Sequence, residues 1–356
     1  MKRITYVSQA TRTVAAEELN EIAAVSVRNN ARSQVTGILL LCGPFFFQIL
    51  EGEESSVDQT LDRIQGDDRH RDVQILKVET AIQSRQFPEW SMQTIRLDDS
   101  DDALIQALQR MLANLAESRQ ILERYTQPTI LEFLSKGINP LLAPHKKEEK
   151  VVLFGDIAAF DALASFYSTE EVAEHASCFL EVLSNSVIRN GGQVNKYMGD
   201  KVLAYFAPER ADQAIKSCLE SLEELRTLRA NAAQCRLRNF LYGGFGLALG
   251  PVIEGNFGGA LKLDYTILGN TVNMASRMES LTRSTGRAIM CDDSVKATCK
   301  DHWDWDLLGD FKLKGQTTNS RCFSLKNEIV ADTRTLDEMI EQVMSTTEEH
   351  RRNCFC

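Results

Sequence analysis

Two aspartates in the second half of the sequence stand where apolar strands are predicted to end. Asp156 follows the run KVVLFG (150–155), and Asp200 lies at the turn of a predicted hairpin, GGQVNKYMGDKVLAYF (191–206). Carboxylate oxygens are the hard ligands that Mg²⁺ prefers in proteins. A single aspartate beside a glycine is commonly structural, so the pair indicates a metal site only together with residues that could bind phosphate.

Residues suited to a phosphorylated substrate follow the second aspartate. Asn273 and Arg277 lie four residues apart, on one face of a helix predicted within DYTILGNTVNMASRMESL (264–281), a segment that begins as a loop. Lys314 precedes the glycine of a predicted closing hairpin, FKLKGQTTNSRCFSL (311–325). An arginine on a helix face is usually solvated, and a hairpin lysine usually lies on the surface. Neither residue alone therefore indicates phosphate binding, and the prediction depends on the whole set.

Together these segments resemble the catalytic domain of class III nucleotidyl cyclases, over residues 150–326. The matching motifs are FGDIAAF, KYMGDKVLAYF, DYTILGNTVNMASRM and LKGQ, in the family's order. The resemblance implies that Asp156, Asp200 and the carbonyl group of Ile157 bind two Mg²⁺ ions, with Mn²⁺ as the alternative, in a two-metal mechanism. It also implies that Arg277 stabilises the α-phosphate, Asn273 positions the ribose, and Lys314 holds the β- and γ-phosphates. The product would be a 3′,5′-cyclic nucleotide, released with pyrophosphate.

Two positions bear on the choice of base. By the same resemblance, Lys196 and Thr266 contact the purine. A lysine donates to adenine N1, an acceptor, whereas a guanine reader typically has glutamate at that position. Thr266 departs from the more common aspartate, but a hydroxyl group can accept from the adenine amino group. ATP is therefore the favoured substrate, and guanylyl cyclase activity is the alternative.

The resemblance also implies a dimer, because in this family each site lies between two subunits. The metal aspartates come from one subunit and the nucleotide-binding residues from the other, so one chain that carries every role predicts a head-to-tail homodimer. A predicted helix at 104–125 has apolar residues at heptad spacing. These are Leu104, Leu108, Met111, Leu115 and Leu122. We expect a parallel dimer helix, and a core helix of a single domain is the alternative.

Three polar residues in the first hundred are unusually placed. Tyr6 lies in the middle of a strand, Asn30 ends the first predicted helix, and Gln48 interrupts the apolar run FFFQIL. A strand tyrosine usually serves packing, and an asparagine suits a helix C-terminus. A buried amide without a partner costs about 1–3 kcal/mol. Gln48 should therefore be hydrogen-bonded to something.

The elements around these residues predict a small α+β sandwich with its helices on one face of a mixed sheet. Strands are expected at 3–8, 34–41, 45–51, 73–80 and 91–97, with helices at 15–29 and around 57–64. In the second half, an apolar strand (150–157), helices near 158–167 and 169–189, and a glycine-rich strand pair (244–259) predict an α/β domain.

The first hundred residues resemble the BLUF family of flavin-binding blue-light sensors, which has a ferredoxin-like fold. The resemblance rests on Tyr6, Asn30 before VTGILL, Gln48 in FFFQILEGE, DDRHRDV (67–73), and Trp90-Ser91-Met92. It implies a flavin between the two helices, FAD as first choice and FMN as the alternative. Asn30 would bond the isoalloxazine edge and Gln48 would bridge Tyr6 and the flavin. Trp90 and Met92 would carry the light-induced change to the last strand. Arg69, His70 and Asp72 match the family's surface motif, without an assigned contact.

Composition excludes several other classes of protein. The 356 residues include 40 Lys and Arg against 50 Asp and Glu, a net charge of −10, which argues against a nucleic-acid binder. The most apolar stretch (37–50) is broken by Gly43-Pro44 and is shorter than the roughly 20 residues that span a bilayer. No signal peptide is visible at the start. The sequence therefore predicts a cytoplasmic protein that binds neither membrane nor nucleic acid.

The predicted organisation is a sensor at 1–97, a coupler at 98–149, a catalytic domain at 150–326 and a polar tail at 327–356. The coupler would combine the dimer helix with a short helix and loops, and a partner-binding helix is the alternative for the tail. The leading hypothesis is a light-activated adenylyl cyclase. The rivals are a photosensory nucleotide-binding module with a weak or inactive cyclase domain, and a flavin redox enzyme. The redox enzyme ranks last because no dinucleotide fingerprint is present.

Overall fold

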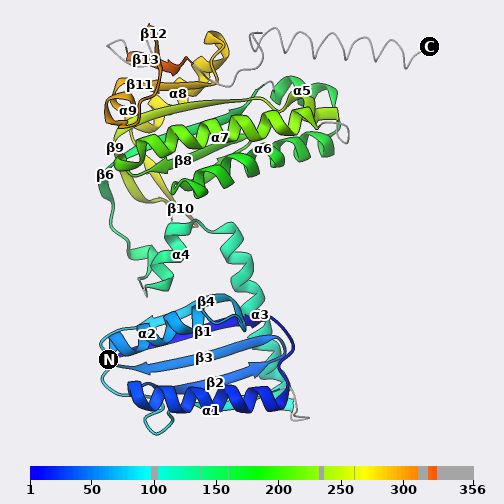
Figure 1. Ribbon diagram of the computed structural model, residues 1–356, viewed down its shortest axis with the longest axis vertical. Helices are drawn as coiled ribbons and strands as arrows, with labels where there is room; N and C mark the ends of the chain where they lie inside the picture. Colours follow the sequence, from blue (N-terminus) through cyan, green and yellow to red (C-terminus); the bar gives the residue numbers. More distant parts are fainter. Residues whose placement is uncertain are drawn as a thin grey trace, which may run out of the picture. The chain divides into compact units, whose positions relative to one another are not determined.

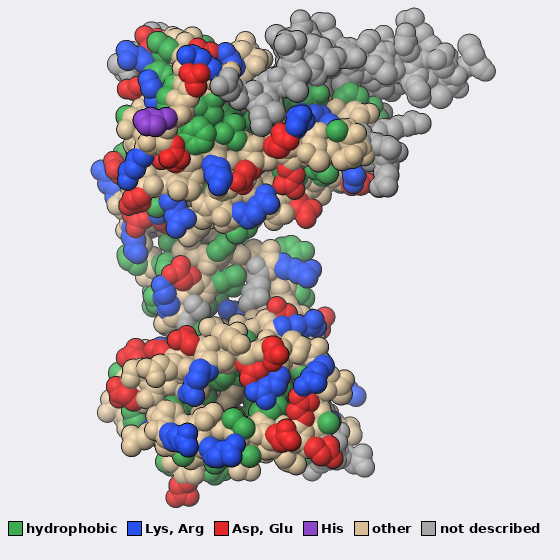
Figure 2. Space-filling view, in the orientation of Figure 1, with side chains coloured by type: hydrophobic (Ala, Val, Ile, Leu, Met, Phe, Trp, Pro, Cys, Tyr) green, Lys and Arg blue, Asp and Glu red, His purple; other side chains and the backbone are tan. Residues whose placement is uncertain are grey.

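A computed structural model describes residues 1–97, 103–136, 138–158, 160–231, 236–259, 261–311 and 320–326. The chain divides into two units, Met1–Ala143 and Pro144–Cys356 (Figure 1). Lys314 and the tail at 327–356 lie outside the described residues. Within the described residues, no helix is both long and apolar enough to cross a bilayer. On the face shown in Figure 2, acidic and basic side chains are interspersed on both units.

The first unit is built on a five-stranded sheet with the strand order β4-β1-β3-β2-β5. Its strands are β1 (Lys2–Ala10), β2 (Thr36–Cys42), β3 (Phe45–Gly52), β4 (His70–Glu79) and β5 (Gln93–Arg96). The pairs β4-β1, β1-β3 and β3-β2 are antiparallel, and β5 joins β2 in parallel. This is the mixed sheet that the sequence predicts.

The two helices predicted for this domain lie on one face of the sheet, as expected, and the helix predicted for the coupler covers the other face. On one face, α1 (Ala16–Ser33) and α2 (Glu54–Gln65) pack through a cluster that includes Leu19 and Leu61 and also contains Tyr6. On the other face, α3 (Ala103–Tyr125) packs Ala116 in a cluster with Val7. Tyr6 and Val7 are consecutive strand residues and so point to opposite faces. Both faces are apolar, and each therefore needs a helical cover.

The helix α3 presents two apolar stripes. One stripe, Ile105, Leu112 and Ala116, packs against the sheet. The predicted heptad seam lies elsewhere on the helix: Leu108, Met111, Leu115 and Leu122 are all exposed, Met111 by 69%. The helix is therefore part of its own domain core and also leaves an apolar stripe on the surface. Beyond it, α4 (Pro128–Ser135) lies against β4, and a short 3₁₀ turn, η1 (Pro140–Leu142), follows.

The second unit contains an eight-stranded sheet in which seven strands follow the order β12-β13-β11-β9-β6-β8-β7 and β10 pairs with β9. Its strands are β6 (Lys146–Ile157), β7 (Gln193–Met198), β8 (Lys201–Phe206), β9 (Gly243–Gly259), β10 (Lys262–Leu268), β11 (Ile289–Asp292), β12 (Trp305–Phe311) and β13 (Ser320–Leu325). Its helices are α5 (Phe160–Phe166), α6 (Thr169–Arg189), α7 (Ala211–Ala230), α8 (Asn270–Thr285) and α9 (Asp293–Thr298), with 3₁₀ turns η2 (Pro208–Arg210) and η4 (Arg236–Phe240).

Layers on both faces of β6 fix the architecture of this unit. The helices α6 and α7 lie side by side on one face, where Phe179 and Ile215 join Leu153 in the larger core (Figure 1). On the opposite face, Met278 of α8 packs in a second core with Phe154. The alternation of Leu153 and Phe154 places one in each core. This arrangement agrees with the α/β domain predicted from the sequence.

Two local predictions for this unit are wrong, and one helix was not predicted. Residues 244–259 belong to one long strand, β9, rather than a strand pair, because β9 has β6, β11 and β10 as successive partners. The expected loop at 264–268 is part of the strand β10. No element was predicted for 207–243, where α7 lies with Ile215, Cys218 and Leu222 buried at helical spacing.

A glycine in β9 lets the helix α8 approach the sheet closely. A Cβ atom at Gly246 would lie 2.1 Å from the backbone nitrogen of Glu279 and 2.2 Å from the carbonyl oxygen of Ala275. Real Cβ atoms do not come this close to backbone, so only glycine fits. Gly246 thus serves the packing of α8, the helix that carries Asn273 and Arg277.

Candidate functional site

The predicted partner of Gln48 is present in the first unit. Tyr6 and Gln48 face each other across the β1-β3 pair, and the Tyr6 hydroxyl group donates to Oε1 of Gln48. The Gln48 amide nitrogen in turn donates to the sulfur of Met92, 3.3 Å away. All three side chains are buried. Burial raises the pKa of Tyr6, so the phenol is protonated at neutral pH and acts as the donor.

Asn30 and Trp90 are tied to the same region by the backbone around Ser91. The helix α1 runs to Ser33, so Asn30 is within its last turns and does not end the helix as predicted. The Asn30 amide donates to the carbonyl oxygen of Ser91 at 3.0 Å. The Trp90 side chain is 41% exposed and stacks on Phe87, with 5.1 Å between ring centroids. Met92, and not Trp90, therefore contacts the Tyr6-Gln48 pair.

A cleft between α1 and α2 extends to Gln48. Its lining residues are Ile22, Val25, Ser26, Asn29, Asn30, Leu39, Gln48, Thr60, Arg63, Ile64, Asp67, Arg69 and His70. The lining combines apolar side chains, two buried amides and two guanidinium groups. Such a lining fits a flavin nucleotide, because a planar ring needs apolar walls with few polar contacts and the phosphate needs cations.

The motif DDRHRDV, to which the sequence analysis assigned no contact, contributes residues to the lining of this cleft. Arg69 and His70 belong to the lining, together with Asp67, which the sequence did not single out. The Arg69 side chain donates to Asp67 at 2.9 Å and holds the pKa of that carboxyl group down to about 2. Nδ1 of His70 lies 2.7 Å from the hydroxyl oxygen of Ser8. Burial lowers the pKa of His70, so the imidazole is neutral in the fold.

A buried carboxylate anchors the segment that carries Trp90 and Met92. Glu51, at 0% exposure, accepts backbone hydrogen bonds from Gln86 at 2.8 Å and Phe87 at 2.9 Å. It also accepts from Nε of Arg3. The segment between β4 and β5 has no helix or strand of its own, and Glu51 supplies two of its fixed contacts, in addition to those that join Trp90 to Gly37 and Ser91 to Asn30.

Replacing Glu51 with alanine is expected to lower the free energy of unfolding by about 3 kcal/mol, because Nε of Arg3 and two backbone donors lose their acceptor. Chemical denaturation measures this loss, and Trp90 fluorescence should report the freed segment. Glu89→Ala is the matched control, since Glu89 is exposed on the same segment. Equal stability of the two variants would contradict the anchoring role of Glu51.

In the second unit, strand pairing brings the two predicted metal ligands together. Asp156 is the last residue but one of β6, before Ile157, and its register partner on β8 is Lys201, which directly follows Asp200 at the β7-β8 turn. Asp156 is 2% exposed, and its Oδ1 atom has no hydrogen-bond partner within the described part of the chain. Burial, and next the Glu279 carboxylate, raises the pKa of Asp156. Burial and the charge of Asp156 raise the pKa of Asp200 to about 6.

A buried carboxylate and a half-buried neighbour whose pKa it raises, with one oxygen lacking a partner among the described residues, fit a divalent cation. A cation would relieve both the repulsion and the missing contact. Among the described residues, no group of three or more His, Cys, Asp or Glu side chains could hold a metal ion. Further ligands would have to be backbone oxygens, such as the carbonyl of Ile157, or substrate oxygens.

Three charged residues that the sequence analysis missed surround Asp156. Lys201 and Arg283 both bind its Oδ2 atom. The same two cations lie 3.5 Å and 3.6 Å from the carboxylate of Glu279, which is 1% exposed. Glu279 and Arg283 are four residues apart on α8. This spacing is the one feature of the sequence that could have indicated an ion pair here. The cluster connects α8 to the end of β6.

The predicted nucleotide-binding residues form a second group on β7, β10 and α8. Lys196 pairs with Asp264 at 2.6 Å, and the Thr266 hydroxyl group donates to Oδ1 of Asn195 at 2.7 Å. Asn273 is exposed on α8. One turn later, the Nη1 atom of Arg277 is buried without a hydrogen-bond partner in the described part of the chain.

The two groups are not joined to each other. Within the described residues, no hydrogen bond or ion pair links Asp156 or Asp200 to Lys196, Thr266, Asn273 or Arg277. Each group is also incomplete for a nucleotide, because the two cations beside Asp156 are already bound to its carboxylate, and the second group contains neither of the two predicted metal ligands. Lys314, the remaining predicted residue, is outside the described residues.

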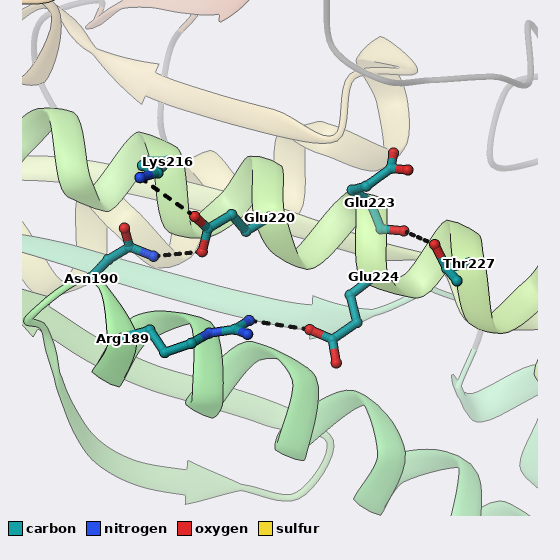
Figure 3. A pocket seen from close by; sticks show the side chains of 7 residues that line it. All are labelled: Arg189, Asn190, Lys216, Glu220, Glu223, Glu224 and Thr227. Atoms are coloured by element: carbon teal, nitrogen blue, oxygen red, sulfur yellow. Dashed lines mark hydrogen bonds and ion pairs between the residues drawn. The ribbon is translucent and has the colours of Figure 1, made fainter.

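A depression between α6 and α7 is a different kind of site (Figure 3). Figure 3 shows Arg189 paired with Glu224, and Glu220 bonded to both Lys216 and Asn190. These partners neutralise one another, and neither of the two aspartates predicted to bind metal lines the depression. It offers neither a catalytic group nor an unpaired charge to a nucleotide.

Comparison with known proteins assigns a family to each of the two predicted domains. Residues 1–93 match the BLUF family, described as sensors of blue light using FAD, and residues 142–327 match the adenylate and guanylate cyclase catalytic domain. Photoactivated adenylate cyclase subunit beta of Euglena gracilis is 32% identical over 294 residues, 82% of this chain and 34% of that protein. The chain thus spans about a third of the length of this curated relative.

A solved structure covers nearly the whole chain. A bacterial light-regulated adenylyl cyclase superposes with a TM-score of 0.90 at 34% identity, over 98% of this chain and 99% of that one. A second such structure gives a TM-score of 0.87 at 36% identity, with the same coverage. The order of the two domains, their folds and this coverage agree, and the chain therefore belongs to the family of light-regulated adenylyl cyclases that join a BLUF domain to a class III cyclase catalytic domain.

Proposed function

We propose that this chain is a blue-light-activated adenylyl cyclase that converts ATP into 3′,5′-cyclic AMP and pyrophosphate. The observation that carries the proposal is the carboxylate pair of Asp156 and Asp200, in which Asp156 is buried and its Oδ1 atom has no hydrogen-bond partner in the described part of the chain. A purely structural aspartate pair would be satisfied by donors from the surrounding chain. The full-length match to bacterial light-regulated adenylyl cyclases supports the same activity.

In this proposal, Asp156, Asp200 and the Ile157 carbonyl group hold two Mg²⁺ ions, with Mn²⁺ as the alternative. The metal ions would lower the pKa of the ribose 3′-hydroxyl group and neutralise the triphosphate. Lys201 and Arg283 keep the Asp156 carboxylate oriented at the end of β6. Their positive charges also help to keep it ionised, against the effect of its burial.

Arg277 and Asn273 act on the nucleotide from α8. The Nη1 atom of Arg277 has no hydrogen-bond partner among the described residues and can therefore donate to the α-phosphate, where negative charge develops in the transition state. Asn273 binds the ribose, and Lys314 holds the β- and γ-phosphates. Lys196 and Thr266 read the base, with the ammonium group donating to adenine N1 and the hydroxyl group accepting from the amino group.

The active enzyme is proposed to be a homodimer with a catalytic site at the interface. Neither group of site residues suffices alone, and no described contact joins them within one chain. A second copy would bring the carboxylates of one chain to the cations of the other. The exposed stripe on α3 provides an apolar surface that a second copy could cover. A cytoplasmic location belongs to the same proposal, because ATP is available there.

The cleft between α1 and α2 is proposed to bind FAD, with FMN as the alternative. A bound flavin would supply the absorption of blue light and accept an electron. Tyr6 holds the proton that hydrogen-bonds Gln48, and the amide of Gln48 can exchange donor for acceptor by rotating. Such a change would break or reform its contact with Met92. The segment between β4 and β5 would then pass the change to β5 and α3.

Purified protein is expected to be yellow and to form more cyclic AMP from ATP under blue light than in darkness. The measurement is nucleotide cyclisation, lit and dark, with ATP and with GTP in parallel. Equal rates in light and darkness would contradict light activation. Binding of ATP without formation of either cyclic nucleotide would favour the rival, a nucleotide-binding module with an inactive cyclase domain.

A further inference from the structure

The strand β7 contains a bulge at the residue before Lys196. In the pairing of β7 with β8, Val194 is opposite Ala204 and Lys196 is opposite Leu203, so Asn195 is an extra residue without a partner of its own. A bulge of this kind re-aims side chains and often lies beside an active site. In a regular strand, by contrast, neighbouring side chains point to opposite faces.

The contacts around the bulge show which side chains it redirects. Val194 packs in the core formed with α6, and the Tyr197 hydroxyl group lies 2.9 Å from Ser184 of α6. Asn195 and Lys196, between them, both reach β10 instead. Their partners, Thr266 and Asp264, are two residues apart on β10 and so share one side of that strand. The bulge therefore places two consecutive side chains on the same side.

The two contacts to β10 fix the polar groups at the proposed base-reading position. Asp264 holds the ammonium group of Lys196 at 2.6 Å. Thr266 donates its only hydroxyl proton to Oδ1 of Asn195 at 2.7 Å, and both side chains are buried, at 3% and 5% exposure. A hydroxyl group that has given up its proton offers a further ligand only acceptor lone pairs.

We infer, on the basis of the function proposed above, that Asn195 is a positioning residue that sets the preference for ATP over GTP by fixing Thr266 as a hydrogen-bond acceptor. The adenine amino group is a donor and suits this acceptor. The corresponding O6 atom of guanine is an acceptor, so it meets a lone pair and gains no hydrogen bond. Without Asn195, the hydroxyl group of Thr266 can rotate and donate to guanine as readily as it accepts from adenine.

The test compares kcat/KM for ATP and GTP in the full-length, illuminated protein. Asn195→Leu fills the same space without an acceptor and is expected to lower the ATP-to-GTP ratio about tenfold, the worth of roughly one hydrogen bond. Asn195→Asp keeps the acceptor and should keep the ratio of the wild type. In a Thr266→Val background, Asn195→Leu should leave the ratio unchanged, because the group through which it acts is gone.

A structural role for Asn195 predicts a different pattern. Loss of folding in the bulge would reduce ATP and GTP turnover by the same factor and leave their ratio intact, which would overturn the inference. So would loss of the preference in Asn195→Asp, or a further fall of the ratio in the Thr266→Val background. Because a ratio is independent of the fraction of protein that is folded, partial misfolding does not obscure the result.

Binding of 3′-deoxy-ATP and 3′-deoxy-GTP, measured by displacement of a fluorescent nucleotide, separates this inference from the proposed function. These analogues lack the reacting hydroxyl group, so their relative affinity can be measured even if the protein forms no cyclic nucleotide. A wild type that prefers 3′-deoxy-ATP, with a preference lost in Asn195→Leu, supports the inference. A wild type that binds the two equally would overturn it.

Discussion

The variant Asp156→Asn is expected to form cyclic AMP at least about a thousandfold more slowly than the wild type, in light and in darkness. Asparagine preserves the shape of the side chain but removes the negative charge and one ligand oxygen, at a position that is 2% exposed and next to Asp200. The measurement is ATP cyclisation at saturating Mg²⁺. The flavin absorbance should be unchanged, which would show that the first domain is folded and contains its flavin.

Arg277→Ala should also be inactive, and this makes the two-chain site testable. If the carboxylates of one chain serve the arginine of the other, a dimer of one Asp156→Asn chain and one Arg277→Ala chain contains one intact site. Co-expression with two different tags and purification on both should therefore restore about half of the wild-type rate. A site confined to one chain predicts no recovery, because each chain carries a defect.

A matched pair of variants controls for nonspecific recovery. Dimers of one Asp156→Asn chain and one Asp200→Asn chain should stay inactive, because both residues belong to the same carboxylate group. Each of the two sites then lacks one metal ligand. Recovery in this control would contradict the assignment of the carboxylates to one side of the interface, whatever the first mixture shows.

The sequence could predict those features that depend on local pattern. An amide in the run FFFQIL implied a partner, and the structure supplies two, Tyr6 and Met92. Asp156 and Asp200 were expected at strand ends, and the register of β6 with β8 brings them together. Strong periodicity likewise gave most of the helices and strands of the first unit.

Features that depend on contacts between distant elements could not be predicted in this way. Lys201 and Arg283 look like ordinary surface charges in sequence, and only the packing of α8 against β6 brings both to Asp156. The bulge at Asn195 depends on a register shift against β8, which leaves no mark in a run such as QVNKYM. The apolar residues of α7 are interleaved with small polar ones, which weakens the helical pattern.

The variant Gln48→Leu is expected to lose the light-induced red shift of the flavin band and the light activation of the cyclase together. Leucine fills the space but removes the acceptor of the Tyr6 hydroxyl group and the donor to Met92. The group that could alter its hydrogen bonding on illumination is then missing, so activity should stay at its dark level. Absorbance difference spectra and cyclic AMP formation on the same sample measure the two effects.

Met92→Leu separates the photochemistry from the transmission of the signal. It keeps the Tyr6-Gln48 hydrogen bond and removes only the sulfur that accepts from the Gln48 amide. The red shift should therefore persist while light activation falls severalfold. The segment that leads to β5 then no longer has a hydrogen bond that depends on the orientation of the Gln48 amide. A Met92→Leu protein with full light activation would show that the signal leaves Gln48 by another contact. A protein that loses the red shift as well would place Met92 within the photochemical group itself, beside Tyr6.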